Sequence, residues 1–402
     1  MGDDGSAWIT SVSPLSSLRM LVPDGCWLVL AASYAAVVYA AEWRTKAVII
    51  INSRREKRKG GIILRTARIY FSGTVLLILF GAAFPQECAG REWKTKVVDD
   101  MAVRPSDKTE PARGRGINAA LLKAAEFAEF VKIQHSVFAL PFALLSAAVA
   151  GKNGLSASQI LWIVAAMVGA RSSAMGFNRI ADRHLDALNP RTAGRSLPSG
   201  RLSLLEAWVF VTASTAFFVF SAAKLNRLAL MLSPAALVVI WGYSFTKRFT
   251  ALSHLFLGLA LGIAPAGAWI AIRGSLGLPA VILSAAVIFW VAGFDIIYAC
   301  QDYSFDKRHG LHSIPARFGI ATALKISEAM HIVTLLLFVW LKYVVGFGWI
   351  YTAALLAAGV LLFVQHRMVR PDDLSRADAA FFTANGFLSL AFSGMAILDI
   401  YV

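Results

Sequence analysis

Charged side chains are scarce in this chain. Asp, Glu, Lys and Arg together make up 16% of its 402 residues, whereas soluble domains carry about 25%. Hydrophobic residues make up 57% of the sequence, above the usual range of about 45–50%. This composition excludes an intrinsically disordered, collagen-like or coiled-coil protein, and it argues against a set of soluble domains.

Cysteine is nearly absent, and acidic residues are fewer than basic ones. The three cysteines, Cys26, Cys88 and Cys300, form no Cys-x-x-Cys pair, so they indicate neither a zinc site nor a disulfide framework. Lys and Arg number 39 against 24 Asp and Glu, which gives a net charge of +15. That charge would suggest nucleic-acid binding in a soluble protein. Here the basic residues lie mainly between apolar runs, so we expect no nucleic-acid partner and a lipid bilayer instead.

Long apolar runs dominate the sequence from residue 134 onward. A membrane-spanning helix needs about 20 mostly apolar residues, and lipid cannot satisfy free backbone groups, so we expect helices. The runs are too long and too continuous for the strands of a membrane barrel. The prediction is an all-α integral membrane protein with nine spans, near 134–151, 158–177, 204–222, 226–245, 253–272, 279–299, 322–341, 348–365 and 378–400.

Basic residues are distributed unevenly between the two sets of loops. The loops after the second, fourth, sixth and eighth spans carry 14 Lys and Arg, and the opposite loops carry 5. Because cytoplasmic loops are enriched in Lys and Arg, we expect the first set in the cytoplasm. The segment before the first span is then also cytoplasmic, and the C-terminus lies outside.

Residues 1–116 differ from the rest and are expected to be a separate N-terminal extension, with the main domain at 117–402. The extension holds two apolar stretches, near 26–41 and 70–85, around a basic cluster. Two interpretations stay open: translation begins at Met101, or the extension is a genuine pair of helices.

Two pairs of aspartates follow even-numbered spans. Asp182 and Asp186 form one Asp-x-x-x-Asp pair, and Asp302 and Asp306 form the other. Corresponding members of the two pairs are both 120 residues apart. This is a weak internal repeat, of the kind that builds a central site in membrane proteins.

The spacing of each pair has a chemical reason. Residues i and i+4 share a helix face, so the two carboxylates repel one another unless a cation neutralises them. Mg²⁺ is usually held by one or two carboxylates together with substrate phosphates. One pair alone would be explained as solvated charges at a helix end. Two pairs in equivalent places favour a Mg²⁺–diphosphate site, with the phosphate charge shared by basic residues, here Arg183, Arg191, Arg195, Lys247 and Arg248.

Longer motifs surround these aspartates. Residues 178–186 read NRIADRHLD, residues 189–200 read NPRTAGRSLPSG, and residues 295–306 read DIIYACQDYSFD. Together they resemble the UbiA superfamily of intramembrane aromatic prenyltransferases. The stretches KIQHSVFALP at 132–141 and YSFTKRFT at 243–250 are similar to the 4-hydroxybenzoate polyprenyltransferase branch. The resemblance covers about residues 125–400 and leaves out residues 1–115.

The resemblance implies a nine-helix bundle with a central cavity open to the cytoplasmic side. It implies that Asp182, Asp186, Asp302 and Asp306 bind Mg²⁺ and, through it, diphosphate. Further implied site residues are Asn178 at the metal site, Arg183, Lys247 and Arg248 on phosphate oxygens, and Asp295 and Tyr298 around the reacting carbon. Lys132 is either a cytoplasmic anchor for the first span or a ligand of the acceptor carboxylate.

The implied activity is transfer of a polyprenyl group from polyprenyl diphosphate to the ring of a small aromatic acid. The expected acceptor is 4-hydroxybenzoate, in ubiquinone synthesis, in a bacterial inner membrane. One alternative is a dihydroxynaphthoate in menaquinone synthesis. A membrane transporter is the alternative outside enzymes, because repeated halves and intramembrane acids fit that class too. Acids at the span ends among arginines favour an anionic diphosphate over a transported cation.

Overall fold

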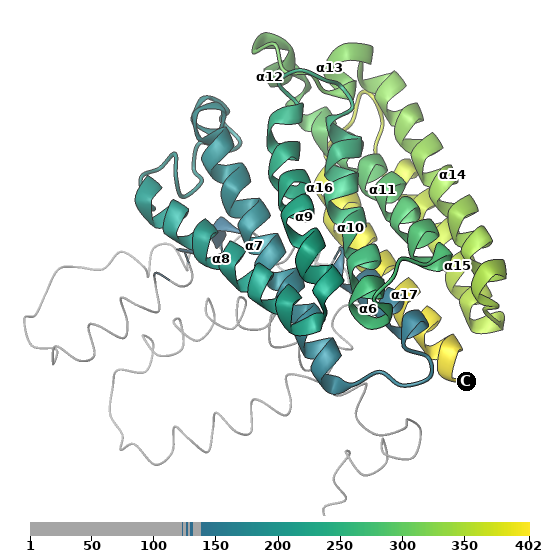
Figure 1. Cartoon of the computed structure of the whole chain (residues 1–402). Coiled ribbons are helices and arrows are strands. Elements are labelled where there is room, and N and C mark those ends of the chain that lie inside the picture. Colours follow the sequence, from purple (N-terminus) through teal and green to yellow (C-terminus); the bar gives the residue numbers. More distant parts are fainter. Residues whose placement is uncertain (1–122, 124–125, 128, 132–137) are drawn as a thin grey trace, which may run out of the picture. The chain divides into compact units, whose positions relative to one another are not determined.

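The computed structural model describes residues 123, 126–127, 129–131 and 138–402 (Figure 1). The predicted N-terminal extension, its Met101 and the candidate residue Lys132 lie outside the described residues. Helices account for the regular structure of the described part, which contains no strand apart from an isolated bridge between Arg370 and Asp373. The all-α prediction is therefore confirmed.

Eight helical stretches within the described residues are long and apolar enough to cross a membrane. The predicted first span, 134–151, corresponds to α6, whose 11 described residues are fewer than a span needs. The count of nine therefore stays a prediction. The helices are α6 (Leu140–Ala150), α7 (Ala157–Leu188), α8 (Leu204–Leu225), α9 (Arg227–Thr246), α10 (Ser253–Arg273), α11 (Leu278–Ala299), α14 (Ile320–Val345), α15 (Trp349–Arg367) and α17 (Asn385–Tyr401), and the short ones are η3 (Cys300–Asp302), α12 (Tyr303–Arg308), α13 (Ile314–Phe318), α16 (Ala377–Ala379) and η4 (Ala380–Ala384).

Local sequence signals set the helix ends. The side chains of Ser156 and Ser203 cap the first turns of α7 and α8 in reciprocal capping boxes, which satisfy otherwise free backbone N–H groups. Asn226 caps α9 in the same position. Gly274 and Gly346 end α10 and α14 with positive φ, a conformation that glycine adopts without a Cβ penalty.

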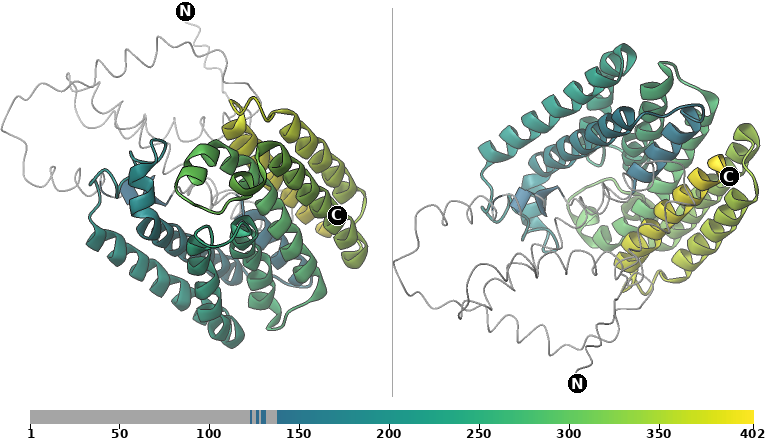
Figure 2. Two further views of the ribbon diagram at one scale, coloured as in Figure 1. Left: turned by 90° about the horizontal axis from the view of Figure 1, so that it is seen from above. Right: turned by 90° about the horizontal axis from the view of Figure 1, so that it is seen from below.

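The helices run side by side, with α7, α8 and α9 on one side and α14, α15 and α17 on the other (Figures 1 and 2). Helices α10 and α11 lie between them and pack closely. Gly258 and Gly262 of α10 face Ile288 of α11, and a Cβ on either glycine would collide with it. Small residues at such contacts let membrane helices approach through backbone packing.

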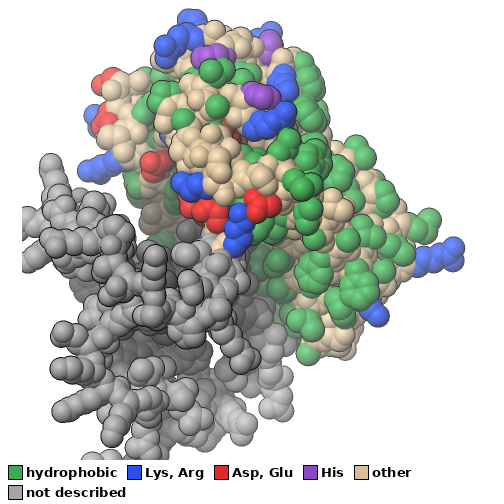
Figure 3. Space-filling model, turned by 90° about the vertical axis from the view of Figure 1, so that its left-hand side faces the viewer, with side chains coloured by type: hydrophobic (Ala, Val, Ile, Leu, Met, Phe, Trp, Pro, Cys, Tyr) green, Lys and Arg blue, Asp and Glu red, His purple; other side chains and the backbone are tan. Residues whose placement is uncertain are grey.

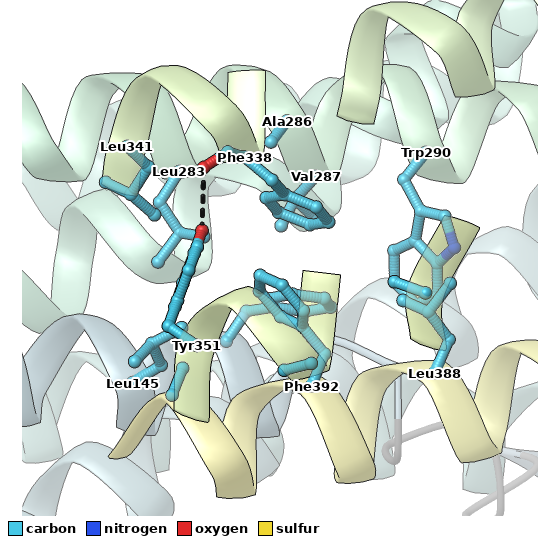
Figure 4. Packing of buried hydrophobic residues seen from close by; sticks show 14 of the residues in the cluster. Leu145, Leu283, Ala286, Val287, Trp290, Phe338, Leu341, Tyr351, Leu388 and Phe392 are labelled. Atoms are coloured by element: carbon cyan, nitrogen blue, oxygen red, sulfur yellow. Dashed lines mark hydrogen bonds between the residues drawn. The ribbon is translucent and has the colours of Figure 1, made fainter. Parts of the chain in front are cut away.

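Aromatic residues fill the interface of α6, α11, α14, α15 and α17 (Figure 4). Trp290, Phe338, Tyr351 and Phe392 are all buried there. The Tyr351 hydroxyl donates to the Phe338 carbonyl at 2.9 Å, and Trp290 Nε1 donates to Asn385 Oδ1 at 3.0 Å. We call this cluster the aromatic core. The buried Trp290 N–H and the buried Tyr351 hydroxyl thus both have acceptors.

The last span contains one irregular turn. Helix η4 is a π-helix between α16 and α17. The carbonyl of Ala380 accepts hydrogen bonds from Gln365 Nε2 at 2.9 Å and Asn385 Nδ2 at 3.3 Å. Side-chain donors thus bond a carbonyl at the point where the helical turn widens.

One end of the bundle carries the segments 189–203, 247–252, 300–319 and 368–376. We call it the carboxylate end, because both predicted aspartate pairs lie there. It is the upper end in Figure 1, where α12 and α13 are drawn. In Figure 3 Lys, Arg and His side chains gather at this end of the visible face, and hydrophobic side chains cover much of the surface to the right. This distribution suits a protein embedded in lipid with one polar end.

Candidate functional site

The first aspartate pair lies on the last two turns of α7. Asp182 and Asp186 are 3% and 6% exposed. Lys247 Nζ donates to Asp182 Oδ2 at 2.6 Å, and Arg195 donates to Asp186 Oδ1 at 2.6 Å. The i, i+4 spacing therefore places both carboxylates on one buried face, as predicted, with a basic partner for each.

The second pair follows α11. Asp302 ends η3, and Asp306 lies in α12. Asn189 Nδ2 donates to Asp302 Oδ1 at 3.0 Å. Arg191 forms a two-pronged pair with the same carboxylate, through Nε at 3.0 Å and through its terminal nitrogen. Such fork-to-fork pairs are strong and fix orientation as well as charge.

The segment 189–200 connects the two pairs. Its Asn189 and Arg191 reach Asp302, and its Arg195 reaches Asp186. Burial alone lowers the pKa of Arg191, but the hydrogen bond and charge of Asp302 outweigh it and raise that pKa above its ordinary value. The guanidinium therefore stays charged, and the segment acts as a basic bridge over both carboxylate pairs.

Lys247 and Arg248 come from the link between α9 and α10. The Lys247 carbonyl accepts from the amide of His312 at 2.7 Å, which ties this link to the segment before α13. The charge of Lys247 also acts on Asp306, so it lies within electrostatic reach of both pairs. Arg248 lies 3.6 Å from Asp182 Oδ1 and donates to the Ala181 carbonyl at 2.6 Å. The segments 189–203 and 247–252 thus both reach α7, and the segment 300–319 contacts each of them.

Two carboxylate oxygens in this cluster are buried without a hydrogen-bond donor: Asp182 Oδ1 and Asp186 Oδ2. A buried oxygen without a donor is costly, and a hard divalent cation satisfies it. The donor set consists of oxygens, which suits Mg²⁺ rather than a softer metal. Within the described residues no three His, Cys, Asp or Glu side chains gather as a complete metal site. The residues fit a cation that completes its shell with other oxygens, such as those of a phosphate.

A largely apolar cavity of about 360 Å³ lies below the carboxylate end, between α7, α8, α9 and α10, with Ala139 at its edge. Among the described residues that line it, Arg171 is the one charged side chain. Arg171 Nε is buried and has no hydrogen-bond partner. Tyr243 lines the same cavity and lies within electrostatic reach of Arg171, Asp182 and Asp295. Tyr243 therefore marks the side of the cavity that faces the carboxylates.

Asp295 and Tyr298 precede the second aspartate pair on α11. His254 Nδ1 lies 2.7 Å from Asp295 Oδ2. The Tyr298 hydroxyl accepts from Arg191 at 2.8 Å, and its ring lies 4.3 Å from that of Phe381, centroid to centroid. Both predicted pocket residues thus lie one to two turns from Asp302.

The remaining predicted residues divide into two groups. Asn178 Nδ2 donates to Asp182 Oδ2 at 3.3 Å, so it contacts the cluster. Arg183 donates to the Ile180 carbonyl of its own helix at 3.1 Å and makes no ion pair with the aspartates. Asp182 and Asp186 share one face of the helix. Arg183 directly follows Asp182, so its side chain leaves the helix in a different direction. Arg183 as a phosphate ligand stays a prediction.

Several residues of this region are missing from the sequence-based prediction. They include Arg171, Tyr243, Asn189 and His254. One signal was available for Arg171, because a cation inside an apolar span marks a functional position by default. The pairing of His254 with Asp295 joins positions 41 residues apart, and no local pattern reveals it.

Comparison with protein families identifies the family of this chain. Residues 139–390 match the family described as the UbiA prenyltransferase family. Among curated relatives, 4-hydroxybenzoate octaprenyltransferase of Serratia proteamaculans is 32% identical over 248 residues, which cover 62% of this chain and 85% of the relative. The enzyme of the same name from Thiobacillus denitrificans is 31% identical over 239 residues, covering 59% of this chain and 81% of the relative.

Solved structures show the same fold. A UbiA homologue from Aeropyrum pernix K1, in its apo form, is 36% identical with a TM-score of 0.58, over 66% of this chain and 97% of that one. A UbiA homologue from Archaeoglobus fulgidus, bound to GPP and Mg²⁺, is 22% identical with a TM-score of 0.57, over 69% of this chain and 100% of that one. The second likeness supports the fold alone.

Proposed function

This chain belongs to the UbiA prenyltransferase family, and we propose that it transfers a polyprenyl group from polyprenyl diphosphate to the ring of 4-hydroxybenzoate. The curated relatives that match more than four fifths of their own length carry that activity in their names. The product would be a precursor of ubiquinone.

One observation carries the choice of an aromatic acid as acceptor: the position of Arg171. A guanidinium in an apolar cavity, with Nε unpaired, is costly unless an anion pairs with it. A planar guanidinium binds a carboxylate in two-pronged geometry. A neutral acceptor would leave this charge without a partner.

The spacing of Arg171 and Asp182 along α7 fits two substrates placed end to end. Arg171 and Asp182 both belong to α7 and are 11 residues apart. At about 1.5 Å per residue, this places the Cα of Arg171 about 16 Å below that of Asp182 along the helix axis. A diphosphate at the carboxylate end and an acid group on Arg171 would hold the allylic carbon and the ring between them. Such fixed placement replaces a bimolecular encounter with a positioned one.

The carboxylate end supplies the diphosphate site in this proposal. Asp182, Asp186, Asp302 and Asp306 would hold Mg²⁺, and the unpartnered oxygens of the first two support this assignment. When bound, Mg²⁺ would neutralise the diphosphate as negative charge develops on it. Lys247, Arg248, Arg191 and Arg195 already surround the carboxylates and would exchange these contacts for phosphate oxygens.

The cavity supplies the environment for the organic chemistry. The bond between the allylic carbon and the diphosphate oxygen breaks, and the apolar walls keep water from the resulting cation. The ring carbon ortho to the phenol hydroxyl attacks it, a carbon–carbon bond forms, and the ring then loses a proton. The prenyl chain is membrane-soluble, so it would enter between helices from the lipid.

The orientation in the membrane belongs to the same proposal. The basic loops favour a cytoplasmic carboxylate end, in a bacterial inner membrane. Their positive charge would also attract a small anionic acceptor from the cytoplasm.

The first test measures prenyl transfer in membranes that contain this chain. Labelled 4-hydroxybenzoate or 1,4-dihydroxy-2-naphthoate is supplied with a long polyprenyl diphosphate, with Mg²⁺ or with a chelator. We expect labelled lipid from 4-hydroxybenzoate, and only with Mg²⁺. Product from the naphthoate alone would replace the ubiquinone assignment with menaquinone. No product from either acid, with the protein folded in the membrane, would reject both.

A second test addresses Arg171 directly. In Arg171→Gln we expect the KM for 4-hydroxybenzoate to rise about 100-fold, because a buried charge loses its partner. The KM for neutral 4-hydroxybenzamide should change little. Arg273→Gln, an exposed cation at the end of α10, is the matched control. An equal rise for acid and amide would contradict a carboxylate site at Arg171.

A further inference from the structure

The contact between His254 and Asp295 joins three elements near the carboxylate end. His254 lies in the first turn of α10, and Asp295 lies in the penultimate turn of α11. Their side chains are 4% and 21% exposed, and His254 Nδ1 lies 2.7 Å from Asp295 Oδ2. The amide of Ile314, the first residue of α13, donates to His254 Nε2 at 3.3 Å.

These two contacts assign the tautomer of the imidazole. Nε2 accepts the Ile314 N–H. Nδ1 then donates its N–H to Asp295 Oδ2, so both ring nitrogens are engaged. Asp295 Oδ1 receives no hydrogen bond from any described residue. The carboxylate is therefore held by one oxygen, and the other oxygen keeps its lone pairs.

Asp295 lies on α11, about two helical turns before Asp302. It precedes Asp302 by seven residues, so it lies about 10 Å below that carboxylate along α11, whereas Arg171 lies about 16 Å below Asp182. It is within electrostatic reach of Tyr243, which lines the cavity. Leu257 and Leu261, one and two turns after His254 on α10, line the cavity as well.

The other candidate acceptors of a proton either have a hydrogen-bond partner or belong to the proposed cation and diphosphate site. The lone pair of His254 Nε2 is used by the Ile314 amide. Asp182, Asp186 and Asp302 are held by basic side chains at the diphosphate level. The Tyr298 hydroxyl accepts from Arg191. Asp295 Oδ1 is the carboxylate oxygen below the diphosphate level that remains available among the described residues.

We propose that Asp295 accepts the ring proton through Oδ1 and that His254 is the positioning residue that orients it. This inference rests on the function proposed above. The new carbon–carbon bond has formed when the step begins. The ring C–H bond then breaks, its electron pair restores the aromatic ring, and the proton moves to Asp295. His254 keeps its proton throughout, and Asp295 later releases the acquired proton to water at the carboxylate end.

The test compares the intact enzyme with Asp295→Asn, using 4-hydroxybenzoate with hydrogen or deuterium ortho to the hydroxyl. We expect the variant to lose about 100-fold or more in kcat, the usual contribution of a positioned base. We also expect its residual reaction to show a primary deuterium isotope effect that the intact enzyme lacks, because proton loss becomes rate-limiting. Full activity, or lost activity without an isotope effect, would overturn the base assignment.

Variants of His254 separate positioning from simple packing. Asn places an amide N–H where Nδ1 stands, so we expect His254→Asn to stay within about tenfold of the intact enzyme, about 1.4 kcal/mol in barrier. His254→Leu lacks any donor and should share the isotope effect of Asp295→Asn. Equal losses in both His254 variants, without an isotope effect, would overturn the positioning role. His309→Asn, an exposed histidine, is the control and should match the intact enzyme.

Two measures keep these results separable. If Asp295→Asn does not accumulate as folded protein, Asp295→Glu is measured instead. It keeps a carboxylate but displaces it, so a slower reaction with the isotope effect is again expected, and unchanged kinetics would overturn the proposal. Product formation by the intact enzyme tests the proposed function itself. Absence of product would reject that function. Product formation by the intact enzyme, together with unchanged kinetics in the Asp295 and His254 variants, would reject this inference alone.

Discussion

Helix α11 contributes to two regions, the aromatic core and the carboxylate end, which differ in the hydrogen bonding of several buried polar groups. In the aromatic core, the buried Trp290 N–H and the buried Tyr351 hydroxyl each have a hydrogen-bond acceptor. At the carboxylate end, Asp182 Oδ1 and Asp186 Oδ2 are buried and lack a donor. An unsatisfied buried group costs about 1–3 kcal/mol, and more when it is charged. The core therefore stabilises the fold. At the carboxylate end, arginines lie 3.6 Å from Asp182 Oδ1 and 4.0 Å from Asp186 Oδ2 without donating a hydrogen bond, so these oxygens carry a cost that a bound ligand would relieve.

The comparison predicts that mutations in the two regions separate activity from stability. At the carboxylate end, removing a charge should abolish activity and leave the fold intact or more stable. In the aromatic core, removing volume should lower stability and leave the kinetics of the folded fraction unchanged.

The largest expected effect is on activity in Asp182→Asn. We expect prenyl transfer to fall more than about 1,000-fold, above about 4 kcal/mol in barrier, while the thermal unfolding temperature in detergent does not fall. The reason is the loss of a ligand charge at the proposed diphosphate site. Asp372→Asn, an exposed acid near the same end, is the control. More than about a tenth of the activity left in Asp182→Asn would contradict the comparison.

The next effect is on stability in Phe392→Ala. This ring is 2% exposed and stacks on Phe338 with centroids 4.2 Å apart. We expect the free energy of unfolding to fall by about 3 kcal/mol, as for other buried phenylalanines. Phe363→Ala, whose side chain is 61% exposed on α15, should cost far less. Denaturation in detergent measures the free energy of unfolding of both variants. A changed KM in the folded fraction of Phe392→Ala would contradict the separation of activity from stability between the two regions.

A smaller loss is expected where α11 passes α14. A Cβ added to Gly293 would lie 2.5 Å from the ring of His331. We expect Gly293→Ala to lower the free energy of unfolding by about 2 kcal/mol, because neither packed helix can yield freely. Gly394→Ala, where a Cβ meets open space, should be neutral or stabilising. Since Gly293 lies two residues before Asp295, a kcat loss larger than the stability loss would show that this contact also sets the site.

The smallest effect concerns Arg201 at the edge of the carboxylate end. Its guanidinium pairs with Glu126 at 2.9 Å and Glu129 at 3.4 Å, and its side chain is 43% exposed. We expect Arg201→Gln to cost about 0.5 kcal/mol or less, as exposed ion pairs do. The difference should vanish in high salt. A large, salt-independent loss would show that this edge belongs energetically to the buried cluster.

The sequence was sufficient for the features that follow local rules. Apolar runs predict the spans, because lipid leaves the backbone no other choice than helices. The i, i+4 spacing predicts that Asp182 and Asp186 share a face. The motif at 189–200 places basic residues near the aspartates in sequence, and in the structure Arg191 and Arg195 contact Asp302 and Asp186. Their role as phosphate ligands stays a prediction.

Features that depend on tertiary packing were not predicted. The pair of His254 and Asp295 requires α10 and α11 to be placed side by side, and nothing in either segment specifies the other. Arg183 was grouped with the phosphate ligands because it lies within the motif, yet in the structure its side chain returns to its own helix. Proximity in sequence does not fix the direction of a side chain on a helix.

The π-helix in the last span has a consequence for the angular register of that helix. Ala377 and Ile400 are both buried and lie 23 residues apart. At about 100° per residue, an uninterrupted α-helix would turn them about 140° away from each other. A widened turn takes up one additional residue without rotation, which reduces the offset to about 40°. The widened turn thus absorbs a surplus residue, so that one long helix presents a single buried face along its whole length. Deleting one residue from Ala380–Ala384 should therefore restore regular α-helical turns and leave Leu388 and Phe392 facing the core they fill.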